Sequence, residues 1–179
     1  KIELIQKNAD DRFLLKGGSL SGWNIEFIGV SEGVVINKQR FNRNLLTGCL
    51  TLLDINIDGI DINANGGLCE DIVNLVRVNG SIRNIDVTNA LSDAIDVDFS
   101  NLNFASIQVK NAGNDCVDLS SGNYYIKDSE LVSCKDKAIS VGEGSTLSIN
   151  SSKISMSNIG VASKDSSTVK VKSIDIIST

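Results

Sequence analysis

Acidic residues are concentrated in one short stretch of this chain. Between positions 90 and 120 there are five aspartates and a single lysine, Lys110. The aspartates are Asp93, Asp96, Asp98, Asp115 and Asp118. Asp96 and Asp98 alternate with apolar residues, and Asp118 follows Asp96 by 22 positions. Carboxylates crowded in this way repel one another, so the stretch predicts raised pKa values or a bound cation.

Three kinds of chemistry suit these aspartates. Calcium prefers clustered oxygen ligands, so Asp96, Asp98 and Asp118 are candidate calcium ligands. Paired carboxylates also act on glycosidic bonds, and a lyase would need a basic side chain beside them. The candidates for such an enzyme are Asp93, Asp96, Asp115, Asp118 and Lys137. The third interpretation is structural, with solvated aspartates at strand ends and turns.

The composition excludes several function classes. The 179 residues include no His and no Pro, and the formal net charge is −5. Without His, neither a Ser-His-Asp triad nor a histidine metal site can form. The acidic balance argues against nucleic acid as a partner, and no apolar run reaches the ~18 residues of a membrane span. The four cysteines have no C-x-x-C spacing, and we interpret them as small buried thiols.

A period of 22 residues organises the second half of the chain. The segment 94–98 is followed 22 positions later by 116–120, and after the same step by 138–142. The same step relates Asp71, Asp93, Asp115 and Lys137. Self-similarity at this interval is typical of a stacked solenoid. Equivalent residues should therefore form columns that run along the stack.

Two repeat architectures use periods near this length. A leucine-rich repeat would follow its strand with a helical segment, but here alternating apolar residues continue through the rung. We therefore predict a right-handed parallel β-helix of about seven rungs. Regular rungs are expected over 69–179 and irregular ones over 1–68, with strands near 23–28, 34–36 and 50–62. One core row should contain Ala90, Ala112, Cys134 and Met156.

We expect one β-helix domain that is part of a larger protein. The chain begins at Lys1, and its final expected strand, near 174–177, would leave an open rung. Uncapped solenoid ends expose unpaired strands. Protein contacts at these ends are therefore one expectation for the partners.

Two segments resemble motifs of polygalacturonases. Residues 93–97 (DAIDV) and 113–117 (GNDCV) are similar to the two acidic motifs of that family, one rung apart. The resemblance implies catalytic acids at Asp93, at Asp115 and at the position before Asp115, which is Asn114 here. The His-Gly and Arg-x-Lys motifs of the family have no counterpart in this chain. The match therefore implies the fold more strongly than the reaction.

A second resemblance covers residues 69–177. The segments SDAIDVDFS (92–100), GND (113–115), DKAISVGE (136–143) and NIGVASKD (158–165) occur in this order. They resemble the β-helix modules associated with bacterial spore-coat H-like (CotH) kinase proteins. This resemblance implies a bacterial, extracytoplasmic module that is secreted or attached to the surface. It implies no reaction.

The expected function is a non-catalytic structural or carbohydrate-binding module, with calcium as its candidate stabilising ion. One alternative is a polysaccharide-active lyase or hydrolase that uses the acidic face. The other is an assembly or spacer unit that stacks on protein through its open rungs. An enzyme should have a groove with a free Lys or Arg beside Asp96 and Asp118. In a structural module, the aspartates should instead bind turn amides or a neighbouring lysine.

Overall fold

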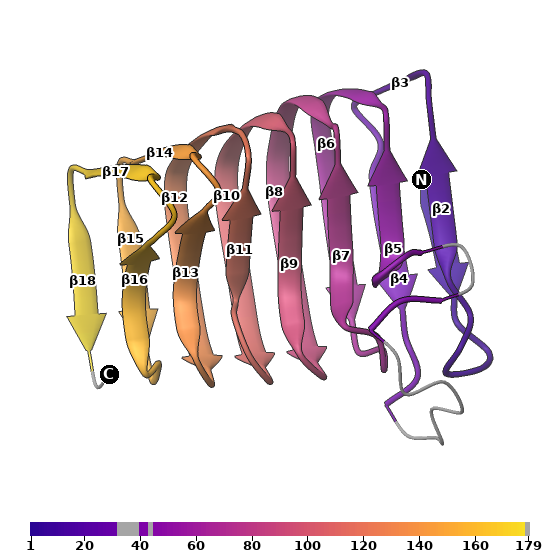
Figure 1. The fold of residues 1–179 in the computed structure, drawn as a ribbon. Helices are drawn as coiled ribbons and strands as arrows, with labels where there is room; N and C mark the ends of the chain where they lie inside the picture. The colour runs from indigo at the N-terminus through magenta and orange to yellow at the C-terminus, as the bar shows by residue number, and fades with distance from the viewer. Residues whose placement is uncertain (32–39, 43–44, 178–179) are drawn as a thin grey trace.

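The chain forms a parallel β-solenoid. The computed structural model describes residues 1–31, 40–42 and 45–177, and all regular elements in these ranges are β-strands. The solenoid has about eight turns of about 22 residues each (Figure 1). The predicted parallel β-helix and its period are confirmed. There is about one turn more than predicted.

Two parallel sheets run along the stack. The seven-stranded sheet has the order β16-β13-β11-β9-β7-β5-β2. Its members are β2 (Phe13–Lys16), β5 (Gly48–Leu53), β7 (Asp71–Val76), β9 (Asp93–Asp98), β11 (Val117–Ser120), β13 (Lys137–Gly142) and β16 (Ile159–Ser163). Consecutive strands of this sheet come from consecutive turns, so residues one turn apart lie side by side.

The eleven-stranded sheet supplies the other sides of each turn. Its early strands are β1 (Ile2–Ile5), β3 (Ser19–Ser21), β4 (Asn24–Ile28) and β6 (Asn56–Asn65). The long central strands are β8 (Asn79–Ala90), β10 (Asn101–Ala112) and β12 (Asn123–Cys134). The last four are β14 (Thr146–Ile149), β15 (Ser152–Ser155), β17 (Thr168–Val171) and β18 (Ile174–Ile177). The strand predicted near 34–36 lies outside the described residues.

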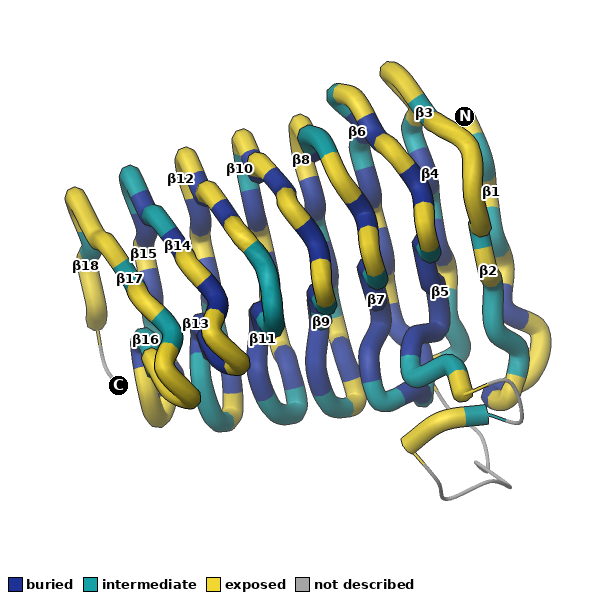
Figure 2. The backbone as a smooth tube through the Cα atoms, turned by 45° about the horizontal axis from the view of Figure 1, so that its top comes forward, coloured by how far each residue is buried: buried dark blue, intermediate teal, exposed yellow. Residues whose placement is uncertain are grey.

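Aliphatic columns between the two sheets form the core. Ile95 of β9 lies opposite Val117 of β11, which lies opposite Ile139 of β13. All three side chains are fully buried, and buried segments recur on every central turn in Figure 2. Residues that alternate with them along each strand point away from the core. This alternation directs Asp96 and Asp98 toward the outer face of the seven-stranded sheet.

The repeat is one residue longer where β14 and β15 pair with β12, and it returns to 22 residues where β16 pairs with β13. Strand β12 pairs with β14 so that Asn123 faces Thr146, an interval of 23 residues. The extra residue lies at the turn around Glu143 and Gly144, where both φ angles are positive. Met156 consequently follows Ser133 in its column and is 61% exposed. The prediction that Met156 belongs to the core row is wrong, because this extra residue moves it one position along.

The four cysteines form two disulfide bonds, Cys49–Cys69 and Cys116–Cys134. The cysteines are buried, but their interpretation as thiols is wrong. Each pair is separated by 20 or 18 residues, slightly less than one turn, and the closing of that turn brings the Cα atoms within 5.5 or 5.4 Å. Disulfides persist mainly in oxidising compartments, which is consistent with a location outside the cytoplasm. Within the described residues, no helix could cross a membrane.

Candidate ligand-binding hollow

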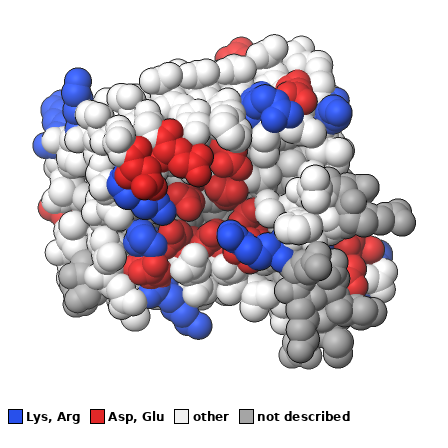
Figure 3. All heavy atoms as spheres, viewed as in Figure 1, with Lys and Arg blue, Asp and Glu red and all other residues white. Residues whose placement is uncertain are grey.

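The outer face of the seven-stranded sheet carries a hollow lined by acidic side chains. Figure 3 shows acidic groups gathered in this depression, with basic groups at its margin. The carboxyl groups come from β7, β9, β11 and their preceding turns. We call this site the acidic hollow and define it by Asp71, Asp93, Asp96, Asp98, Asp115 and Asp118. These residues belong to two columns and one additional position.

The first column consists of outward-facing residues in the middle of the strands. Strand pairing places Thr51, Asn74, Asp96, Asp118 and Ser140 side by side in that order. Adjacent strands are about 4.8 Å apart, so the column presents one polar group at each such step. The predicted pairing of Asp96 with Asp118 is confirmed. We call this set the open column.

Asn74, a member of the open column, also contacts Asp98, the third aspartate predicted to bind calcium. Its Nδ2 donates a hydrogen bond to Asp96 Oδ2 at 2.9 Å and a long one to Asp98 Oδ2 at 3.5 Å. Asp98 lies two residues beyond Asp96 on the same strand, so it borders the column. An uncharged donor therefore lies beside Asp96 and Asp98, where a cation would bind.

The second column lies at the start of each strand and consists of Asp71, Asp93, Asp115 and Lys137. Asp93 Oδ1 accepts hydrogen bonds from Asp115 N and from Asn114 Nδ2, both at 2.8 Å. One turn further, Asp115 Oδ1 accepts from Lys137 N at 2.9 Å and from Lys137 Nζ at 3.3 Å. The carboxylates of Asp93 and Asp115 thus connect successive turns. We call this set the turn column.

Lys137 is also held by a second acidic group. Its ammonium group forms ion pairs with Asp115 and with Asp136 at the rim. Asp115 is 2% exposed, so Lys137 provides most of the charge compensation for a buried carboxylate. A lysine paired in this way has no free position for a substrate proton. The structure places Lys137 beside Asp115 as predicted, and it shows Asp136 as a second partner of the ammonium group.

Burial raises the pKa values of the carboxyl groups in the hollow. Burial and the charge of Asp71 raise the pKa of Asp96 to about 9. Burial also raises the pKa of Asp71 to about 7 and that of Asp93 to about 6. Asp98 and Asp115 have raised pKa values for the same reason, opposed by the bond from Asn74 and the amide of Lys137 respectively. At neutral pH, Asp96 is therefore a neutral carboxylic acid.

Several buried oxygen atoms in the hollow have no hydrogen-bond partner among the described residues. Two are carboxylate atoms, Asp118 Oδ1 and Asp71 Oδ2, and two are the hydroxyls of Thr51 and Ser140. Buried polar atoms are usually paired, so a group of four on one face is notable. Three of the four belong to the open column. The open column therefore has unused hydrogen-bonding capacity.

Sequence reasoning identified the aspartates but missed Thr51, Asn74 and Ser140. The interval of 22 residues leads from Asp96 back to Asn74 and from Asp118 forward to Ser140. This interval could have identified Asn74 and Ser140, but the prediction considered charged side chains alone. Thr51 is 23 residues from Asn74, outside the regular interval.

Comparison with protein-family models, curated proteins and solved structures finds no match for this chain. The polygalacturonase and spore-coat resemblances therefore have no independent support from such a match. The fold defines the class of protein: a disulfide-containing parallel β-solenoid with a polar hollow on one sheet.

Proposed function

We propose that the chain is a non-catalytic, extracytoplasmic carbohydrate-binding module, and that the acidic hollow is its binding site. The open column carries this proposal, because it offers donors and acceptors side by side. Asn74 Nδ2 makes only a long hydrogen bond of 3.5 Å to Asp98, so this donor can turn to a ligand, and Asp118 Oδ1 has no partner and can accept. A sugar hydroxyl both donates and accepts, so a hydroxyl-rich chain along the column would satisfy these groups.

The turn column supports a binding role over a catalytic one. Asp93 and Asp115 occupy the positions that resemble polygalacturonase acids, yet each binds the next turn through a backbone amide. Asn114, at the third such position, donates to Asp93. Lys137 is paired with two carboxylates. The carboxylates and the lysine that a hydrolase or lyase would need for proton transfer are therefore already occupied by bonds within the protein.

Two further properties belong to the proposal. The disulfides favour an oxidising compartment, in agreement with the resemblance to secreted or surface modules of bacteria. We also infer right-handed winding, because crossovers between parallel strands almost always have that hand. The module would then display its ligand-binding face along one side of a straight stack.

Binding to a polysaccharide panel tests the proposal. We expect uncharged polymers to bind more tightly than acidic ones, because the hollow repels anions. The double variant Asp96→Asn with Asp118→Asn should lower affinity for the preferred polymer at least about tenfold, because it replaces the Asp118 carboxylate, which only accepts hydrogen bonds, by an amide. Affinity electrophoresis followed by titration calorimetry measures this.

A matched control removes two charges elsewhere. Asp128→Asn with Asp175→Asn changes exposed aspartates on the eleven-stranded sheet, and affinity should be unchanged. No binding across the panel, or equal losses in both double variants, would contradict the proposed site. Release of new reducing ends that disappears in the Asp96 and Asp118 variant would favour the enzyme alternative.

Calcium is a second candidate ligand of the same hollow. The oxygen atoms of Asp98 and Asp118 suit it chemically, and Asp118 Oδ1 is unpartnered. In the described residues, however, no three acidic, His or Cys side chains are already arranged around a common metal position. Binding would require the Asn74 amide to move away from Asp96. Any calcium site should therefore be weak, as in extracellular modules.

Thermal unfolding in calcium and in a chelator decides the calcium question. A dissociation constant of about 1 mM would give about 1.4 kcal/mol of stabilisation at tenfold excess. The increase in Tm should vanish in the Asp96→Asn and Asp118→Asn variant and persist in the control. An unchanged Tm in the wild type would exclude calcium while leaving carbohydrate binding intact.

A further inference from the structure

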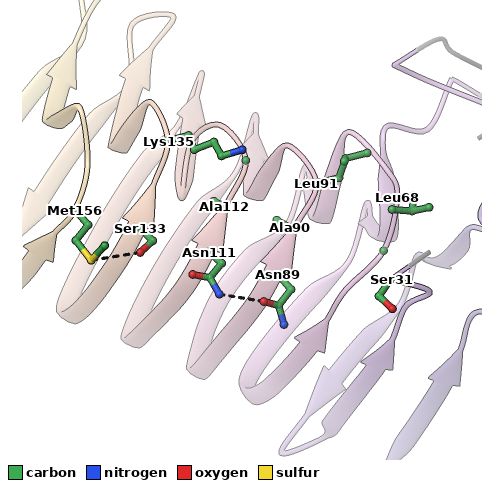
Figure 4. A pocket seen from close by; sticks show the side chains of 12 residues that line it. Ser31, Leu68, Asn89, Ala90, Leu91, Asn111, Ala112, Ser133, Lys135 and Met156 are labelled. Atoms are coloured by element: carbon green, nitrogen blue, oxygen red, sulfur yellow. Dashed lines mark hydrogen bonds between the residues drawn. The ribbon is translucent and has the colours of Figure 1, made fainter. Parts of the chain in front are cut away.

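A separate groove runs along one corner of the solenoid. It lies where the long strands β8, β10 and β12 turn into the seven-stranded sheet, and its volume is about 490 Å³ (Figure 4). It extends over five successive corners, from Leu68 to Met156. Four steps of about 4.8 Å give a length of about 19 Å. None of its lining residues belongs to the acidic hollow.

Backbone conformation fixes the floor of the groove. Ala90, Ala112 and Gly113 form its centre. A β-carbon added at Gly113 would lie 1.9 Å from the carbonyl oxygen of Leu91, so no side chain fits there. The absence of a side chain at Gly113 leaves a gap between Leu91 and Lys135, which occupy the equivalent positions on either side. The groove is therefore open at this point because the closely packed backbone of the neighbouring turn requires a glycine at position 113.

One wall is a column of residues in the left-handed conformation. Asn89, Asn111, Ser133 and Met156 have φ angles of 60°, 64°, 60° and 59°. Asn tolerates this region well, whereas a bulky side chain is strained in it. Met156 has this strained conformation although it is 61% exposed, and its sulfur receives a long hydrogen bond of 3.6 Å from Ser133 Oγ. Strain at an exposed apolar residue suggests a function beyond folding.

The Asn residues of this wall present amide groups to the groove. Asn89 Nδ2 donates to Asn65 Oδ1, and Asn111 Nδ2 donates to Asn89 Oδ1 at 3.1 Å. Asn111 Oδ1, at the end of this ladder, accepts no hydrogen bond from the described residues. The opposite wall is apolar except at one end, with Leu68 and the 54% exposed Leu91. A ligand must therefore combine polar groups along one edge with apolar groups along the other.

Among the lining residues that the structure describes, Lys135 is the only charged one. Among the described residues it forms no ion pair, and its side chain is exposed. A ligand anion at this end would meet an uncompensated ammonium group. An acyl chain would bury the Asn wall without partners, which is costly. Sugar rings usually stack on aromatic side chains, and the lining contains none.

We propose that this groove binds an extended peptide segment with aliphatic side chains and a terminal carboxylate near Lys135. Main-chain amides would bind the Asn wall, and the aliphatic side chains would contact Leu91 and Met156. About six residues span the groove at 3.3 Å per residue. The site is independent of the acidic hollow, and its occupant is a protein segment of defined chemistry.

A peptide-binding assay tests this proposal. The probe is a fluorescent heptapeptide pool with Ala, Val or Leu at alternate positions and Ser or Asn elsewhere, made with a free carboxylate or as the amide. We expect the carboxylate pool to bind the wild type, measured by fluorescence polarisation. The amide pool and the variant Lys135→Glu should each bind at least about tenfold more weakly. Leu91→Asn should also weaken binding.

Two further variants keep the test falsifiable. Lys127→Glu makes the same charge change at an exposed position on β12 and should leave binding unchanged. Met156→Asn should weaken peptide binding while raising Tm, because Asn suits the left-handed conformation. Equal binding of both pools, or binding that survives Lys135→Glu, would overturn the proposal. So would a wild type that binds a fluorescent fatty acid but neither pool.

Discussion

A carboxyl group that keeps its proton at neutral pH acts as a hydrogen-bond donor. Asp96 is in this state because burial and nearby negative charges disfavour its ionised form. A hydrogen bond from Asp96 lowers the pKa of its neighbour Asp98, against the effect of burial. The hollow thus contains a neutral acid beside an acceptor. This is chemically distinct from a row of solvated carboxylates.

These carboxyl groups predict an unusual pH dependence of stability. The folded-state pKa values of Asp96, Asp71 and Asp93 are about 9, 7 and 6, against about 3.9 for Asp in an unfolded chain. Between these limits the folded state binds more protons, so the free energy of unfolding should fall as pH rises from about 4 to 9. Urea unfolding across this range, with chelator present, measures the slope.

The variant Asp96→Asn assigns part of that slope to one residue. Asn has nearly the shape of the neutral acid and cannot ionise, so the variant should be more stable than wild type above about pH 8 and decline less steeply. Asp128→Asn serves as the exposed control and should follow the wild-type curve. A wild-type stability that increases with pH over this window would show that the carboxyl groups are not desolvated.

At the scale of strands and turns, the two disulfides start from the same column of residues. Cys49 belongs to the column that continues through Ile72 and Ala94 to Cys116, three turns away. Each bond joins a cysteine of this column to a cysteine 20 or 18 residues later, near the end of the same turn. Each therefore closes a single turn and leaves the contacts between turns to hydrogen bonds and core packing.

Removing one bridge should have a defined cost. For the 18-residue separation of Cys116 and Cys134, loop-closure entropy predicts that the variant Cys116→Ala with Cys134→Ala loses about 3 kcal/mol of unfolding free energy. Urea unfolding under non-reducing conditions measures it. The corresponding Cys49 and Cys69 variant should lose a similar amount, and the two losses should add. A wild type whose midpoint does not respond to reductant would contradict this prediction.

The period in the sequence was sufficient to predict the strands, their columns and the pairing of Asp96 with Asp118. It could not predict the disulfides, because the closing of a turn depends on corner geometry that spacing alone does not define. It also misplaced Met156, since one extra residue near Gly144 changes the register of β14 and β15. In the first third, Asn24 pairs with Asp61, and this interval of 37 residues obscures the repeat.

At the scale of the molecule, the solenoid is a one-dimensional stack. Ile154 is 1% exposed beneath the final strand, whereas Ile176 in that strand, directly opposite it, is 46% exposed. Stability in such a stack is a sum of contacts between neighbouring turns. Internal turns make two such contacts and terminal turns make one, so protection should depend on position.

Hydrogen exchange should show this dependence directly. We expect amides of β9, β10 and β11 to exchange slowest and those of β17 and β18 to exchange fastest, because the central strands have a neighbour on each side. Exchange of the isolated chain followed by mass spectrometry of peptides measures the gradient. Equal protection of central and terminal turns would indicate a single cooperative unit rather than a stack of locally opening ones.

Because each disulfide closes one turn, the bridges also affect the response to mechanical force. A stack pulled from its two ends would lose turns successively, and each released turn would lengthen the chain. The loops enclosed by Cys49–Cys69 and Cys116–Cys134 span 20 and 18 residues and cannot extend. Each residue enclosed by a disulfide loop shortens the fully extended length of the chain by about 3.4 Å. The bridges thus limit how far the chain can extend without setting the force at which its turns separate.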